Sequence, residues 1–120
     1  MTDELPILDA SGLAELRASV GDDDAFVRDL IGTFLAEEPV NLDLVAAAAA
    51  RGDAEAIVRP AHTLKSSAAA IGAARLSTIC RQIEFAGREG RTADLAPLTE
   101  QARAAWAATV EALRAAGLAS

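Results

Sequence analysis

The only histidine of this 120-residue chain, His62, has neighbours that could support chemistry at its imidazole. In a helix, side chains three and four positions apart share a face, which would bring Lys65 and Ser66 beside the ring. A neutral imidazole nitrogen is a competent nucleophile near neutral pH. The Lys65 ammonium would stabilise the negative charge of a group in transfer, such as a phosphoryl group. These three residues form a candidate nucleophilic site.

The same pattern is compatible with a histidine that has no function. A single histidine on the surface of a helix is, in most proteins, a solvated polar residue. A face that carries histidine, lysine and serine is not a motif by itself. Periodicity alone therefore leaves both interpretations of His62 open.

The helix that must position His62 is predicted over residues 53–71, with Asp53 as its N-cap and Gly72 as its C-terminal stop. At about 100° per residue, apolar residues spaced four, three, four and three apart form one stripe of this helix. The stripe consists of Ile57, Ala61, Leu64, Ala68 and Ile71. His62 lies about 140° around the helix from the stripe, so we expect it to face solvent.

Four further helical segments are predicted, because apolar residues recur with the helical period and never with the period of two typical of strands. Asp9 can cap a short first helix, and the acidic run at 22–24 can cap the second. The apolar residues of the second segment are Phe26, Leu30, Ile31, Phe34, Leu42 and Val45. Pro39 interrupts this pattern, and we expect the helix to break, bend or restart there.

The last two segments complete the prediction of the fold. One runs from about residue 74 to 89, and Thr92 can cap the other, which continues to Gly117. Every connection is short, so sequential helices should be antiparallel neighbours. We predict an all-α fold, an antiparallel up-and-down four-helix bundle with an additional short N-terminal helix. The length fits one domain over residues 1–120.

Composition excludes several classes of partner and compartment. The net charge of −7 argues against a nucleic-acid or anionic-membrane binder, since both need clustered lysine and arginine. Cys80 is the single cysteine and cannot form an internal disulfide, which is compatible with a reducing cytoplasm. The N-terminus lacks the basic and apolar runs of a signal peptide, and no stretch reaches membrane-span length. We therefore expect a cytoplasmic protein that acts as a monomer.

The sequence around His62 extends into a longer pattern. It reads Ala61-His-Thr-Leu-Lys-Ser-Ser-Ala-Ala-Ala-Ile-Gly-Ala-Ala-Arg-Leu, and continues through Cys80 and Glu84 to Arg88. This pattern resembles the signature of histidine-containing phosphotransfer (HPt) domains, Ala-His-x-Leu-Lys-Gly-Ser followed by glycine, leucine, Cys-x-x-x-Glu and a basic residue. The match has no gap from Ala61 to Arg88, and weaker similarity covers the rest of the chain.

The resemblance implies a four-helix bundle without kinase activity that relays phosphoryl groups between receiver-domain aspartates in two-component pathways. His62 would be the phosphorylated residue, and Lys65 would lie next to its phosphate. Glu84 and Arg88 match positions where the family places polar residues near the histidine. The expected partners are response-regulator receiver domains and a histidine kinase, which can be a hybrid kinase. Mg²⁺ would belong to the receiver, so no metal site is expected in this chain.

Two residues depart from the family pattern. Ser66 stands where the family usually has glycine directly after the lysine, and it could hinder a partner or form a hydrogen bond at the phosphate. Pro60 lies two residues before His62, inside the predicted helix, where it removes a backbone hydrogen bond at a typical cost of about 3 kcal/mol.

A docking surface for the partner is predicted around Val58 and Ala69, which share the helix face of His62. An alternative function is a module of the same fold that binds a receiver or kinase without being phosphorylated. A structural bundle without either property is the third possibility. A kinase core is excluded, because the chain has no glycine-rich phosphate-binding loop.

Overall fold

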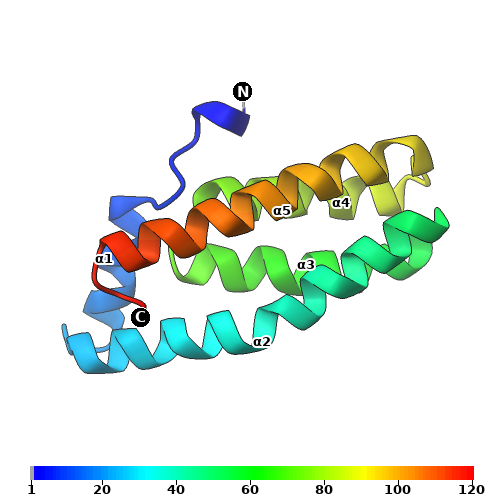
Figure 1. Cartoon of the computed structure of the whole chain (residues 1–120). Coiled ribbons are helices and arrows are strands. Elements are labelled where there is room, and N and C mark those ends of the chain that lie inside the picture. Colours follow the sequence, from blue (N-terminus) through cyan, green and yellow to red (C-terminus); the bar gives the residue numbers. More distant parts are fainter. Residues whose placement is uncertain (1) are drawn as a thin grey trace.

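The computed structural model describes residues 2–120, in which helices are the regular secondary structure and no strand is present. A 3₁₀ turn, η1 (Thr2–Glu4), precedes the helices. The helices are α1 (Ala10–Ser19), α2 (Asp24–Arg51), α3 (Ala54–Ala70), α4 (Ala74–Arg88) and α5 (Thr92–Ala115). Helices α2 to α5 form an antiparallel bundle, and the short α1 lies across one end of it (Figure 1). The predicted fold class, with its additional N-terminal helix, is confirmed.

Aspartate caps begin three of the helices, as the sequence predicts. The side chains of Asp9, Asp23 and Asp53 accept hydrogen bonds from the backbone N–H of Ser11, Phe26 and Ala56. Each satisfies a donor that the first turn of a helix would otherwise leave unpaired. At α5 the prediction was wrong. Thr92 is the first helical residue, Arg91 precedes it, and no side chain caps this end.

Helix α2 is continuous through Pro39. In Figure 1 this helix runs along the lower part of the molecule and changes direction near its middle. Of the three outcomes expected at the proline, a bend is the one found, as is usual where a residue lacks an amide donor. The residues on its inner side are Val27, Ile31, Phe34, Leu42, Val45 and Ala48. Phe26 and Leu30 are exposed, so two of the apolar residues predicted for this helix lie outside the core.

The core consists mainly of small and aliphatic side chains, which allow the helices to approach one another closely. All five residues of the predicted α3 stripe are buried. Phe34 of α2 stacks on Trp106 of α5, with ring centroids 5.2 Å apart. Pro60 is also buried, within an unbroken α3. The bundle thus encloses the inner side of α3 and leaves the outer side for function.

Helices α3 and α4 form the tightest pair, and Gly87 is the reason they can approach so closely. A Cβ atom at Gly87 would lie 2.7 Å from Ile57 Cγ2 and 2.8 Å from the carbonyl oxygen of Ala54. Both distances are below van der Waals contact, so a side chain here would force the helices apart. At the other end, Gly72 turns the chain with a φ of 77° that favours glycine. These two positions fix α4 against the helix that carries His62.

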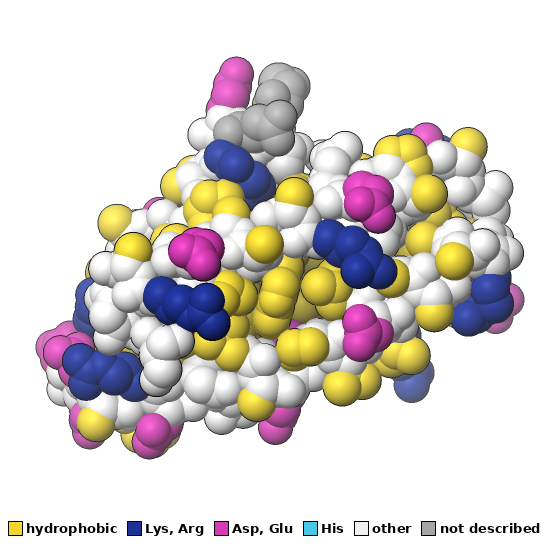
Figure 2. All heavy atoms as spheres, viewed as in Figure 1, with side chains coloured by type: hydrophobic (Ala, Val, Ile, Leu, Met, Phe, Trp, Pro, Cys, Tyr) yellow, Lys and Arg dark blue, Asp and Glu magenta, His cyan; other side chains and the backbone are white. Residues whose placement is uncertain are grey.

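The face formed by α2 and α5 carries mixed charges around an apolar furrow (Figure 2). Ala46 and Ala49 of α2 and Thr99 of α5 contribute to the hollow between the two helices. No histidine is visible on this face. The surface that presents His62 lies elsewhere, along α3 and α4.

Candidate functional site

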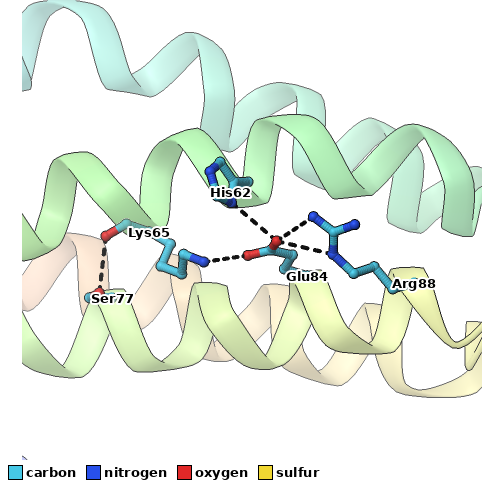
Figure 3. A network of polar contacts seen from close by, with 5 residues as sticks. All are labelled: His62, Lys65, Ser77, Glu84 and Arg88. Carbon is cyan, nitrogen blue, oxygen red and sulfur yellow. Dashed lines mark hydrogen bonds and ion pairs between the residues drawn. The ribbon is translucent and has the colours of Figure 1, made fainter.

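The carboxylate of Glu84 on α4 joins three side chains into one polar cluster (Figure 3). His62 Nδ1 lies 3.1 Å from Glu84 Oε2, and Lys65 Nζ donates to Oε1 at 2.7 Å. Arg88 donates to Oε2 through Nε at 3.1 Å and Nη2 at 2.7 Å. His62 and Lys65 come from α3, whereas Glu84 and Arg88 come from α4. The cluster therefore exists only because the two helices pack side by side.

Exposure differs sharply within the cluster. The Glu84 side chain is only 4% exposed, whereas His62 and Arg88 are 54% and 56% exposed and Lys65 is 26% exposed. An acidic group lies at the base of the site, and the three basic side chains surround it and reach the surface. A partner would meet the imidazole and the cations before the carboxylate.

Glu84 is ionised at neutral pH. Burial alone would raise the pKa of its carboxyl group, but hydrogen bonds from Lys65, Arg88 and His62 outweigh burial and lower the pKa to about 2. An ionised carboxylate accepts hydrogen bonds and cannot donate them. The proton in the contact with His62 therefore belongs to Nδ1. A neutral imidazole protonated at Nδ1 has its lone pair on Nε2, which is the nucleophilic nitrogen.

The structure brings together four of the residues singled out in the sequence: His62, Lys65, Glu84 and Arg88. Ser66 is exposed next to them on α3, outside the contacts around Glu84. The two residues of the predicted docking surface differ in environment. Ala69 is exposed, whereas Val58 is half-buried against α4, where its Cγ2 would lie 2.9 Å from a Cβ at Gly87.

Ser77 is a residue of this region that the sequence analysis missed. Its hydroxyl donates a hydrogen bond of 3.0 Å to the backbone carbonyl of Lys65, which ties α4 to the cationic turn of α3 (Figure 3). A signal was available in the sequence. Ser77 lies seven residues before Glu84, so the two share one face of α4.

Within residues 2–120, no three histidine, cysteine, aspartate or glutamate side chains gather in a way that could hold a metal ion. Within the same residues, no helix has both the length and the apolar character required to cross a membrane.

Comparisons with known proteins identify the family and the fold. The sequence model of the Hpt domain family matches residues 29–116. The fold is similar to a crystal structure of histidine-containing phosphotransfer protein B (HptB) from Pseudomonas aeruginosa PAO1, with a TM-score of 0.78 and 29% sequence identity. That similarity covers 88% of this chain and 90% of the other. No curated protein matches the sequence. The chain belongs to the Hpt domain family, and its function is histidine phosphotransfer in a two-component phosphorelay.

Proposed function

We propose that Nε2 of His62 is the atom that receives the phosphoryl group and passes it on. The observation that carries this proposal is the contact between His62 Nδ1 and the ionised, buried carboxylate of Glu84. This contact fixes the tautomer and the orientation of the ring. It leaves Nε2 with a lone pair on a side chain that is more than half exposed. His62 is also the only histidine of the chain.

The transfer needs positive charge near the moving phosphoryl group, because its negative charge is spread over three oxygens. Lys65 and Arg88 contribute such charge from the two sides of Glu84. In the first step Nε2 attacks the phosphorus of a receiver's aspartyl phosphate, the P–O bond to the aspartate breaks, and a P–N bond forms. The second step reverses this order with the aspartate of another receiver. Positioning and electrostatics supply most of the catalysis in such transfers.

Hpt domains interact with receiver domains and histidine kinases. We propose that a receiver docks across the exposed side of α3, against Ala69, the exposed edge of Val58 and a strip on α2 formed by Val40 and Leu44. Both strip residues are exposed, 62% and 52% respectively. Helix α2 runs antiparallel to α3 through the turn at Gly52, which places the strip level with the turn of α3 that carries His62.

The position of Val40 and Leu44 around α2 supports this docking surface. Ala46 lines the hollow between α2 and α5. At about 100° per residue, the two strip residues lie roughly 120–160° around the helix from Ala46. They are therefore on the side of α2 that is turned away from α5. A receiver that reaches His62 over α3 would meet them.

We further propose that the chain supplies neither the metal ion nor a kinase activity. Mg²⁺ would be held by the acidic site of the receiver, and this chain would contribute no metal ligand. The chain would have no kinase activity of its own and would act as a single copy. The free thiol of Cys80 is compatible with a reducing compartment such as the cytoplasm.

The proposal is tested by incubating the chain with a phosphorylated receiver and Mg²⁺. The expected result is an acid-labile, alkali-stable phosphoryl label on the wild-type chain and on an Arg103→Ala control, which changes an exposed residue of α5, and no label on His62→Gln. A His62→Gln variant that still binds the receiver would show that binding survives without transfer. A label that persists in His62→Gln would place the phosphoryl group on another residue and contradict the proposal. An unlabelled wild-type chain that still binds the receiver would contradict it too, and would favour the binding module.

A further inference from the structure

Glu84 contacts the imidazole at the nitrogen opposite the one that would carry the phosphoryl group. The state of that nitrogen, Nδ1, decides how readily the group leaves. If Nδ1 is bare when the P–N bond breaks, the leaving group is an imidazolate anion, which is a poor one. If Nδ1 carries a proton, the leaving group is neutral imidazole. A residue that holds the proton on Nδ1 therefore determines how fast the phosphoryl group is transferred from His62 to the receiver.

The charged groups around the ring have opposing effects on that proton. Lys65 of α3 and Arg88 of α4 are cations, and both disfavour a positive charge on the ring. Glu84 of α4 is the anion, and it is the group in direct contact with Nδ1. Among the described side chains, α1 and α2 contribute no hydrogen bond or ion pair to the ring. Glu84 is therefore the residue placed to stabilise a protonated ring.

We propose that Glu84 holds the Nδ1 proton on the phosphorylated ring, so that His62 releases the phosphoryl group as neutral imidazole throughout the neutral pH range. This inference rests on the proposed phosphorylation of Nε2. It gives the buried carboxylate a chemical role in the release step, in addition to orienting the ring.

The onward step then balances without any further group. A carboxylate oxygen of the receiver's aspartate attacks phosphorus, and the bond between phosphorus and Nε2 breaks. The electron pair of that bond stays on Nε2 as its lone pair. The proton remains on Nδ1, in its hydrogen bond to Glu84 Oε2. The positive charge of the ring disappears as the aspartyl phosphate forms, and His62 returns to the tautomer found in the structure.

Glu84→Gln removes the negative charge and keeps the size of the side chain. A glutamine carbonyl can accept a hydrogen bond from protonated Nδ1, and its amide can donate one to bare Nδ1, so it favours neither state strongly. Glu89→Gln is the matched control, because Glu89 follows α4, carries the same charge and pairs with Arg91 outside the cluster. Circular dichroism would verify that both variants retain the helical fold.

The experiment phosphorylates each chain, removes the donor and measures the rate of transfer to an excess of unphosphorylated receiver between pH 5.5 and 9. Dividing the wild-type rate by the variant rate at each pH cancels the pH dependence of the receiver. An opposite charge in contact shifts a pKa by about 1–3 units, so the ratio for Glu84→Gln should rise about tenfold or more from the acid to the alkaline end. The ratio for Glu89→Gln should stay level. A level ratio for Glu84→Gln would overturn the inference.

A second measurement uses the wild-type chain alone and does not depend on the folding of a variant. A ³¹P NMR titration gives the pKa of the phosphorylated His62 ring in the folded chain and in the same chain unfolded in urea. The inference predicts a higher pKa in the folded chain, and an equal or lower pKa would overturn it. A chain that acquires no phosphoryl group on His62 would instead contradict the proposed function itself.

Discussion

At the scale of single residues, the site depends on a carboxylate that water hardly reaches. A buried charge is unfavourable unless it is paired and hydrogen-bonded, and Glu84 has donors from three side chains. No buried side-chain nitrogen or oxygen within residues 2–120 lacks a hydrogen-bond partner. The arrangement keeps Lys65 and Arg88 close to His62 before any phosphoryl group arrives. Glu84 is thus the structural centre of the cluster, and in the proposed function it also determines which ring nitrogen reacts.

The lowered pKa of Glu84 predicts how stability depends on pH. The folded-state pKa of about 2 lies below the ordinary value of 4.5, so the stabilisation is fully present above pH 4.5 and is lost as pH falls through about 2. A difference of this size corresponds to roughly 3 kcal/mol. Urea unfolding at pH 5 and pH 2 should therefore show a smaller loss of stability for Glu84→Gln than for the wild-type chain. Equal losses in the two proteins would contradict the assignment of this carboxylate.

Lys65 gives a second prediction at this scale. Lys65→Ala removes the ammonium nearest to Glu84 and should slow phosphoryl transfer by about tenfold to a hundredfold, because positive charge near a transferring group stabilises the transition state. Single-turnover transfer from a phosphorylated receiver measures the effect. Arg103→Ala on α5 is the control, since it removes an equal charge from an exposed position. If Lys65→Ala transfers the phosphoryl group as fast as the control, Lys65 does not contribute to the transfer.

The sequence predicts that His62 and Lys65 share one helix face, because their spacing fixes their relation to each other. Spacing left the function of His62 open, and the resemblance to HPt domains was needed to select it. The sequence left the contribution of Glu84 and Arg88 open. His62 lies ten residues before Gly72 and Gln82 ten residues after it, so these two residues are level with each other in the helix pair. The rotation of α4 about its own axis, however, is set by packing against α3. Gly87 and the apolar side of α4 determine that rotation. Because the rotation of α4 could not be predicted, the contact of Ser77 with α3 could not be predicted either.

At the scale of elements, local signals identified most helix ends. The aspartate caps and the glycines with positive φ at 21, 52, 72 and 90 lie where the predicted helices begin and end. The bend of α2 at Pro39 was harder to predict, because proline removes one hydrogen bond but tertiary packing decides whether the helix continues. The exposure of Phe26 and Leu30 could not be predicted either, because the apolar pattern does not show which side of α2 packs against the other helices.

The close approach of α3 and α4 predicts opposite effects for two glycine substitutions. Gly87→Ala should destabilise the fold by about 1–3 kcal/mol, because its methyl group would overlap Ile57 and the backbone of Ala54. Gly32→Ala on α2 meets no atom within 4 Å and should stabilise the fold by about 0.5–1 kcal/mol through helix propensity. Urea unfolding measures both. Similar effects of the two substitutions would show that the helix pair is not closely packed at Gly87.

At the scale of the whole molecule, charge and apolar surface are distributed unevenly. Residues 1–50 contain 11 acidic and 2 basic residues, so this part of the chain, which includes α2, is acidic. The remaining residues contain 7 acidic and 9 basic residues, and the basic cluster at His62 belongs to this part. Nucleic acid is not expected as a partner of α2, because binding it requires clustered lysine and arginine. The exposed apolar residues of α2 fit a protein surface instead.

The proposed docking surface predicts a difference between two exposed apolar residues. Leu44→Ser on α2 should raise the KM for a phosphorylated receiver about three- to tenfold and leave kcat unchanged, because the contact would be made equally in the bound and transition states. Phe85→Ser on α4 is the control, since Phe85 is 45% exposed but lies at the hollow between α4 and α5. Steady-state transfer assays measure both variants. Equal KM values for the two variants would argue against a receiver on α2.

The central claim is that Nε2 of His62 carries the phosphoryl group. The most direct measurement is an NMR spectrum of the ¹⁵N-labelled chain after phosphorylation by a receiver, in which the coupling between ³¹P and the ring nitrogens identifies the bonded atom. The account predicts a phosphoryl group on Nε2 and a proton on Nδ1. A phosphoryl group on Nδ1, or on any residue other than His62, would contradict it.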